Sequence, residues 1–103
     1  MILNKGDIIW YGKGRKPGKK AVIVSNNQSN RHLDRFQVVP LEKSAGGLYA
    51  GEVELMVQGQ RLKAVTHRLM TISQKLSRGR AGTLTSEELM KLNIVLQIQL
   101  DLL

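Results

Sequence analysis

Residues 6–27, GDIIWYGKGRKPGKKAVIVSNN, restrict the fold more than any other stretch of this chain. Two runs of β-branched and aromatic residues, within strands expected at 6–11 and 20–25, flank a glycine-rich connector. This pattern predicts an antiparallel β-hairpin. The connector, residues 12–20, has no acidic residue, and its basic residues are Lys13, Arg15, Lys16, Lys19 and Lys20. The hairpin loop is therefore expected to present positive charge to a polyanion.

The β pattern continues along the chain. Residues 36–41 form a continuous apolar run that predicts a third strand buried on both faces. Because Pro40 has no N–H to donate, we expect that end of the strand at an edge, a bulge or a strand exit. Residues 52–57 and 61–66 alternate polar and apolar side chains and predict a second hairpin. Residues 80–84 predict a short last strand.

The C-terminal residues predict a helix with well-defined start signals. Thr85 and Glu88 have the spacing of a capping box, and Leu84 and Leu89 occupy the two positions of a hydrophobic staple. The apolar face of this helix is broad and includes Leu92, Val95, Leu96, Leu102 and Leu103, and it is widened further by Met90, Ile94 and Ile98. A helix that is apolar over most of its circumference is buried on two sides. It indicates either a helix seated deep in the core or a homodimer.

Five to six short strands followed by one helix predict a mainly β fold with α structure, in a single domain over residues 1–103. We expect a small, curled antiparallel sheet or barrel packed by the helix. The chain has no cysteine, which leaves no disulfides or thiolate metal sites, and no run of apolar residues approaches a signal peptide or a membrane span. We therefore expect a cytoplasmic protein.

The charge of the chain points to phosphate polyanions. Sixteen Lys and Arg against eight Asp and Glu give a net charge of +8. The basic residues concentrate in 13–20 and 61–80, whereas the acidic residues lie mostly in 42–54 and 87–101. Such segregation suggests one positive face and salt-sensitive binding to nucleic acid. The alternative is a charge that serves solubility alone.

Most catalytic chemistries lack their residues here. The two histidines, His32 and His67, give no metal-ligand spacing, and residues 12–18 lack the strand–loop–helix setting of a nucleotide-binding loop. Cleavage of RNA remains, because the 2′-hydroxyl is an internal nucleophile that requires no cofactor. Such an enzyme needs a base, an acid and cations. His67-Arg68 and Lys19-Lys20 could supply them, although a surface histidine is the simpler reading of His67.

Five short motifs, in this order, together resemble one known family. They are residues 6–10 (GDIIW), 21–32 (AVIVSNN with NRH), 38–41 (VVPL), 63–73 (KAV to TIS) and 82–84 (GTL), followed by the closing helix. The chain is identified by them as similar to the MazF/PemK family of toxin endoribonucleases. The resemblance implies an SH3-like barrel with a terminal helix, a homodimer, and metal-independent cleavage of single-stranded RNA. It also implies a cognate antitoxin whose acidic tail occupies the RNA groove.

The chain departs from the family pattern at the site itself. Where the family carries Arg-Pro, we match Lys20-Ala21, and Glu42-Lys43 stand where Thr-Ser is usual. His67-Arg68 replace an acidic residue and Gln. One hypothesis is a rebuilt catalytic site of Lys20, Glu42, His67 and Arg68. In it His67 is the general acid or base, Glu42 is its counterpart, and Lys20 and Arg68 stabilise the phosphorane. The products are a 2′,3′-cyclic phosphate and a 5′-hydroxyl.

The other hypothesis is a domain that has lost catalysis and binds only RNA or an antitoxin. Both hypotheses assign RNA binding to the basic side chains beside the site, which are Lys13, Arg15, Lys16, Lys19 and Lys43. Few aromatic side chains are available to stack on bases, and Trp10, Tyr11 and Tyr49 are the candidates.

Overall fold

The structure is a computed structural model that describes residues 2–12, 18–44 and 46–102. In this part of the chain the strands are β1 (Asp7–Tyr11), β2 (Lys19–Ile23), β3 (Arg35–Lys43), β4 (Glu52–Val57), β5 (Gln60–Val65), β6 (Met70–Ser73) and β7 (Ser77–Thr83). The α-helices are α1 (Asn27–His32) and α2 (Ser86–Gln99), and two 3₁₀ turns are η1 (Thr66–Arg68) and η2 (Gln74–Leu76).

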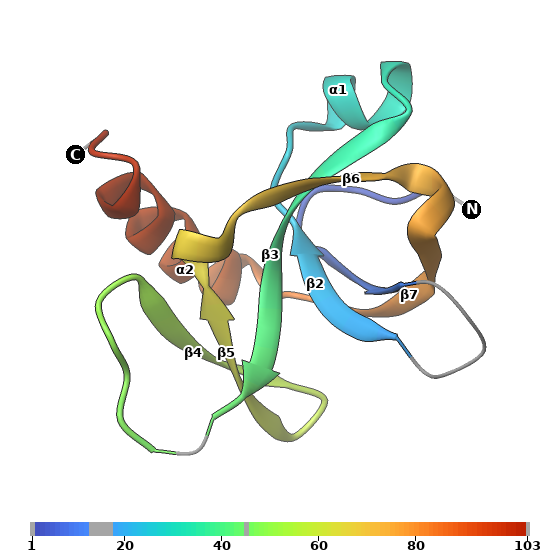
Figure 1. Cartoon of the computed structure of the whole chain (residues 1–103). Helices are drawn as coiled ribbons and strands as arrows, with labels where there is room; N and C mark the ends of the chain where they lie inside the picture. The colour runs from blue at the N-terminus through green and yellow to red at the C-terminus, as the bar shows by residue number, and fades with distance from the viewer. Residues whose placement is uncertain (1, 13–17, 45, 103) are drawn as a thin grey trace.

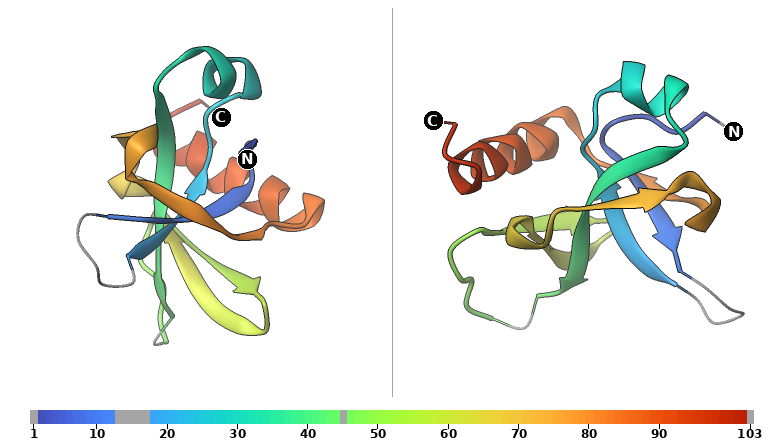
Figure 2. Two further views of the ribbon diagram at one scale, coloured as in Figure 1. Left: turned by 90° about the vertical axis from the view of Figure 1, so that its right-hand side faces the viewer. Right: turned by 45° about the horizontal axis from the view of Figure 1, so that its top comes forward.

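All the strands belong to one antiparallel sheet with the order β4-β5-β3-β2-β1-β7, and β6 pairs with β3 outside that path. Figures 1 and 2 show the sheet strongly curled, with β6 crossing over it and α2 beside the β4–β5 hairpin. The predicted mainly β fold with a C-terminal helix is confirmed. The path begins at β4 and ends at β7, so the sheet is curled like a barrel without closing.

Strand β3 joins the two halves of the curl. Residues 35–38 pair with β6, whereas residues 41–43 pair with β5. Pro40 lies in the gap between these two pairings, where its missing N–H breaks no ladder on that edge. Turn η1 connects β5 to β6 across the same gap. The strand runs two residues beyond the predicted end, and this places Glu42 inside the sheet.

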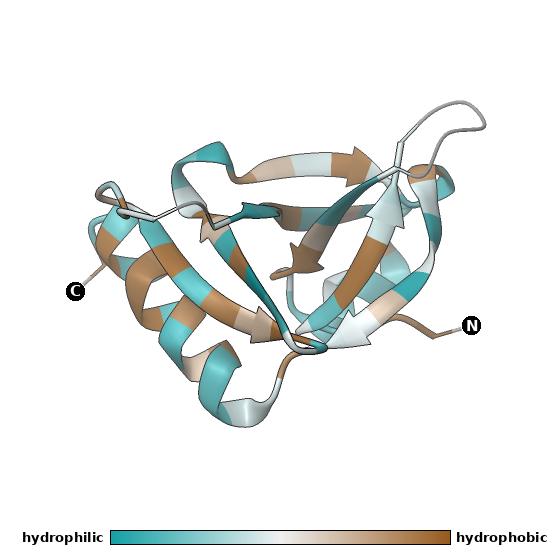
Figure 3. Cartoon of the chain, turned by 90° about the horizontal axis from the view of Figure 1, so that it is seen from below, coloured by the Kyte–Doolittle hydropathy of each residue, from teal (hydrophilic) through white to brown (hydrophobic). Residues whose placement is uncertain are grey.

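Alternation along the strands builds two apolar clusters, one on each face of the sheet. Figure 3 shows this alternation as hydrophobic and hydrophilic bands along the strands. The larger cluster faces α2 and includes Ile8, Val22, Val39, Leu41, Leu55 and Leu92. The other includes Ile9, Ala21, Ile23, Phe36, Val38 and Ile72. Burying each large aliphatic side chain contributes about 1.5–3 kcal/mol, which makes these two clusters the main source of stability.

The start of α2 follows its sequence signals. The Thr85 hydroxyl oxygen accepts from the Glu88 N–H at 3.1 Å, and Leu84 and Leu89 both join the larger cluster. The helix ends at Gln99, so Leu102 lies beyond it and is 66% exposed, in contrast to its predicted place on the apolar face. Leu103 lies outside the described residues.

The same helix also covers the outer edge of β4. The Glu88 carboxylate oxygen Oε2 accepts from the Met56 N–H at 2.8 Å, and Lys91 Nζ donates to the Glu54 carbonyl at 2.9 Å. These bonds satisfy backbone groups that an edge strand otherwise exposes to pairing. Across the described ranges, no helix is long and apolar enough to cross a membrane.

Candidate active site

A row of polar side chains crosses the sheet on the face turned away from α2. Tyr11 pairs with Lys19 across β1 and β2, and Glu42 pairs with Lys63 across β3 and β5. The last pair between β2 and β3 is Lys20 with Leu41, so one further step along this register sets Lys19 beside Glu42. Directly opposed residues of antiparallel strands project to the same face. Tyr11, Lys19, Glu42 and Lys63 therefore form one continuous row.

This row borders a groove of about 580 Å³. Its lining residues come from β1, β2, β3, β6 and the end of η1, and they are Tyr11, Lys19, Pro40, Leu41, Glu42, Lys43, Arg68 and Met70. Three cationic side chains and one carboxylate thus line a cavity large enough for part of a nucleotide chain. This is the electrostatic character that a site for a phosphodiester requires.

Glu42 and Arg68 form the closest polar contact in the groove. Arg68 Nη1 donates to Glu42 Oε1 at 2.8 Å, and the two side chains are 62% and 40% exposed. Turn η1 makes the contact possible, because it connects β5 to β6 across the unpaired gap of β3 and brings Arg68 beside that strand. An ion pair this accessible contributes little stability and remains open to a ligand.

Lys20 lies on the other face of the sheet. It is opposite Leu41 and Trp10, and its ammonium sits 4.7 Å from the centre of the Trp10 ring. A cation over an indole face is a favourable interaction in its own right. The structure therefore separates Lys20 from the predicted partners Glu42 and Arg68, and it brings Lys19 to them instead.

His67 is exposed and belongs to a neighbouring cluster rather than to the lining of the groove. The pKa of Glu52 is lowered, first by the hydrogen bond from the Tyr49 N–H, then by Lys63, with a smaller contribution from the charge of His67. Lys63 Nζ lies 3.2 Å from Glu52 Oε1. His67 therefore stands near the ion pair that Glu52 forms with Lys63, the last member of the polar row.

The predicted RNA-binding side chains divide into two groups. Lys19 and Lys43 line the groove. Lys13, Arg15 and Lys16 lie outside the described residues. The last residue of β1, Tyr11, and the first residue of β2, Lys19, stand on either side of these three residues in the sequence, and both line the groove.

Two parts of the site were missed from the sequence. The first is the Glu52–Lys63 ion pair. In the sequence it is indicated only by the alternation of polar and apolar residues in the second hairpin, which places both side chains on one face of the sheet. Tyr11 is half-buried in the groove, and burial, followed by the nearby charge of Glu42, raises its pKa. The sequence placed Tyr11 among possible stacking residues, and only the register shows that it belongs with Lys19 and Glu42.

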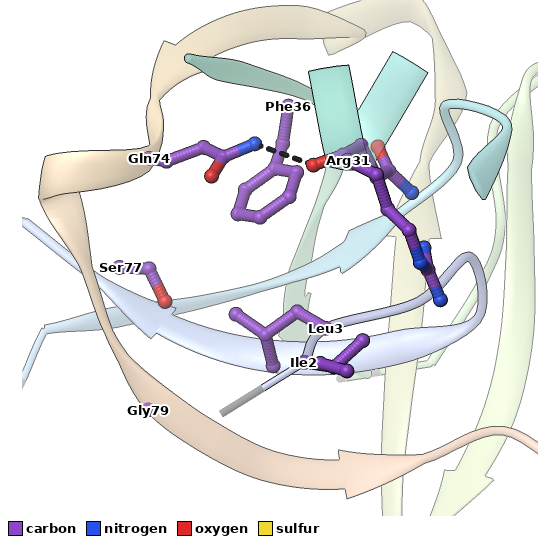
Figure 4. A pocket seen from close by; sticks show the side chains of 8 residues that line it. Ile2, Leu3, Arg31, Phe36, Gln74, Ser77 and Gly79 are labelled. Atoms are coloured by element: carbon purple, nitrogen blue, oxygen red, sulfur yellow. Dashed lines mark hydrogen bonds between the residues drawn. The ribbon is translucent and has the colours of Figure 1, made fainter. Parts of the chain in front are cut away.

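A second cavity, of about 590 Å³, lies at the α1 end of β3, and apolar Ile2, Leu3 and Phe36 line much of it (Figure 4). Its polar groups already hold neighbouring segments together. The Gln74 amide nitrogen donates at 2.9 Å to the carbonyl oxygens of both Asn30 and Leu33. Because Phe36 and Glu42 are at opposite ends of β3, this cavity is separate from the groove.

The comparisons with known proteins agree with the fold. A family model described as "PemK-like, MazF-like toxin of type II toxin-antitoxin system" matches residues 4–100. An endoribonuclease solved with its cognate antitoxin from a mycobacterial species is 21% identical with a TM-score of 0.83, over 99% of this chain and 96% of that one. A chain of a MazE–MazF crystal structure from Deinococcus radiodurans is 17% identical with a TM-score of 0.82, over 100% of both chains.

Mycobacterium tuberculosis toxin MazF-mt6 is 19% identical with a TM-score of 0.77, over 93% of this chain and 97% of that one. No curated protein matches the chain.

Proposed function

The chain belongs to the PemK-like, MazF-like family of toxins of type II toxin–antitoxin systems, and we propose that it is a metal-independent endoribonuclease acting on single-stranded RNA. The observation that carries this proposal is the Arg68–Glu42 contact of 2.8 Å inside a groove that Lys19 and Lys43 also line. A carboxylate beside several cations supplies a base and the stabilisation of a phosphorane together.

The reaction follows from these groups. Glu42 accepts the proton of the 2′-hydroxyl, and the 2′-oxygen attacks the adjacent phosphorus. Lys19 and Arg68 stabilise the charge of the pentacoordinate phosphorane, and Lys43 holds a neighbouring phosphate. The P–O5′ bond then breaks to give a 2′,3′-cyclic phosphate and a 5′-hydroxyl. Because the nucleophile belongs to the substrate, this scheme requires no metal-bound water.

We assign the phosphate-binding role at the end of the hairpin to Lys19 in place of Lys20. The register supports this assignment, since Lys19 opposes Tyr11 and lines the groove while Lys20 opposes Trp10 and Leu41 on the other face. Lys is a compact point charge without the planar fork of Arg. Arg68 supplies the fork instead, from the end of η1.

The proposed partners are RNA, a cognate acidic antitoxin and a second copy of the chain. The net charge of +8 and the cationic groove favour an acidic antitoxin segment that competes with RNA. The predicted dimer is supported by a stripe on α2 in which Met90, Ile94 and Ile98 are 64%, 46% and 61% exposed. We place the toxin in the cytoplasm, where its substrate and antitoxin would be available.

Incubation of the purified protein with mixed single-stranded RNA in EDTA tests this function. The expected result is a set of discrete fragments whose yield falls as salt rises, because binding releases counterions from phosphate. RNA that is bound but stays intact at every pH tested would assign the chain to the non-catalytic, RNA-binding alternative. A protein that neither binds nor cleaves the RNA would contradict both functions.

A further inference from the structure

The proposed cleavage lacks one component, the acid that protonates the departing 5′-oxygen. His67 was expected to supply it, but it does not line the groove, and the groove-lining basic side chains are needed as charges. Of the described residues that line the groove, Tyr11 alone has a side-chain hydroxyl group. Building on the proposed function, we propose that the Tyr11 phenol is the general acid of the reaction.

The positions of Tyr11 and Glu42 suit an acid and a base acting on one phosphate. They flank Lys19 in the polar row, one on each side, on strands β1 and β3. Two strand spacings separate their backbones by about 10 Å. In a displacement at phosphorus the attacking and leaving oxygens are roughly in line. A phosphate held by Lys19 therefore has the base toward one of these oxygens and the acid toward the other.

The backbone holds Tyr11 in place from several directions. Tyr11 pairs with Lys19 on one side and with Ser77 of β7 on the other. The next N–H, that of Gly12, donates to the Leu76 carbonyl at 3.2 Å. Gly18 approaches so closely that a Cβ atom there would lie 2.0 Å from the Tyr11 carbonyl oxygen. The phenol ring also packs against the smaller apolar cluster, so its hydroxyl has a defined direction.

The surroundings of Tyr11 favour its protonated form. Partial burial and the carboxylate of Glu42 both raise the pKa of Tyr11, so the phenol keeps its proton at neutral pH. Tyr11 is thereby available as the acid opposite the Glu42 carboxylate.

The proton balance closes within one turnover. Glu42 gains the proton of the 2′-hydroxyl while the 2′-oxygen forms its bond to phosphorus. The P–O5′ bond breaks, and its electron pair takes the proton of the Tyr11 hydroxyl to give the 5′-hydroxyl product. Tyr11 is left as a phenolate and Glu42 as a carboxylic acid. After the products leave, water returns the proton from Glu42 to Tyr11.

The test compares two leaving groups in Tyr11→Phe. The substrates are one oligoribonucleotide that contains a mapped cleavage site and the same sequence with sulfur in place of the bridging 5′-oxygen. A thiolate leaves without protonation, so the sulfur substrate needs no acid. We expect Tyr11→Phe to cleave the oxygen substrate about 10²–10⁴-fold more slowly than the wild type, with unchanged affinity. The two proteins should cleave the sulfur substrate at equal rates.

Ser86→Ala is the control, because it also removes a hydroxyl group, and Ser86 is exposed at the start of α2 and lies outside the residues that line the groove. It should cleave both substrates like the wild type. If Tyr11→Phe slows both substrates equally, or neither, Tyr11 is not the acid although the ribonuclease assignment stands. If the wild type cleaves neither substrate, the proposed function fails and the assignment of Tyr11 fails with it.

Discussion

The guanidinium of Arg68 donates at 2.8 Å to the carboxylate of Glu42, which lies 26 positions earlier in the chain. Exposed pairs of this kind contribute about 0–1 kcal/mol, so the contact is of little importance for folding. Its importance is positional, since it keeps a base and a bidentate cation side by side in one groove. A bound phosphate offers Arg68 a second anion and leaves Glu42 free to accept a proton.

Replacing Glu42 by Gln removes the base and keeps the shape of the side chain. We expect Glu42→Gln to lower the single-turnover cleavage rate by about 10²–10⁴-fold. RNA affinity should remain or increase, because a negative charge has left the groove. Quenched-flow cleavage and fluorescence anisotropy with the same oligonucleotide measure the two effects. A variant that loses affinity and rate in parallel would show that Glu42 serves binding alone.

Adjacent lysines on β2 provide the most direct test of the register. Lys19→Ala should slow cleavage strongly, because Lys19 lines the groove. Lys20→Ala should leave cleavage near the wild-type rate and lower the thermal midpoint, because it removes the cation over Trp10, an interaction of about 0.5–2 kcal/mol. Cleavage rates and melting curves of both variants show which of the two lysines acts in the groove. The opposite pattern would restore the assignment of Lys20 made from the sequence.

Glu52 should make stability depend on pH in the acid range. Its pKa is lowered from 4.5 by the Tyr49 N–H and by Lys63, so its stabilising contribution is present above the ordinary pKa and is lost as pH falls through the lower folded value. Urea unfolding from neutral to acid pH should therefore show a smaller decline for Glu52→Gln than for the wild type. Parallel declines in the two proteins would show that Glu52 is not responsible.

The exposed stripe on α2 should govern association. Ile94→Glu with Ile98→Glu places two charges on this stripe and is expected to convert the dimer to a folded monomer. Leu33→Glu is the control, because Leu33 is 50% exposed and lies in the α1–β3 connection, away from α2. Light scattering after size exclusion measures the mass of each. A double variant that keeps the mass of the wild type would locate the interface elsewhere.

The order of elements could be predicted because its signals are local. The glycine-rich connector, the alternation of residues 52–66 and the Thr85–Glu88 capping box each act within a few residues, and the structure contains the strands and the helix that they indicate. The end of α2 was predicted too late, since the apolar residues at 102 and 103 continue the pattern beyond the point where the helix ends at Gln99.

The site was harder to predict because a one-residue error in register moves a side chain to the opposite face of a sheet. Two adjacent lysines, Lys19 and Lys20, have equivalent charge and neighbours in the sequence, and only their pairing with Tyr11 and Trp10 separates them. The 3₁₀ turn η1 interrupts the alternation as well. It sends Arg68 to Glu42 and leaves His67 outside the groove lining, although the two are consecutive.

The ends of the RNA products test the central claim most directly. Fragments formed in EDTA should be analysed by mass spectrometry after cleavage by the wild-type protein. Attack by the 2′-hydroxyl, with Glu42 as base, predicts a 2′,3′-cyclic phosphate on the upstream fragment and a 5′-hydroxyl on the downstream one. Fragments with a 5′-phosphate and a free 3′-hydroxyl would instead show attack by water and would contradict the mechanism built on this groove.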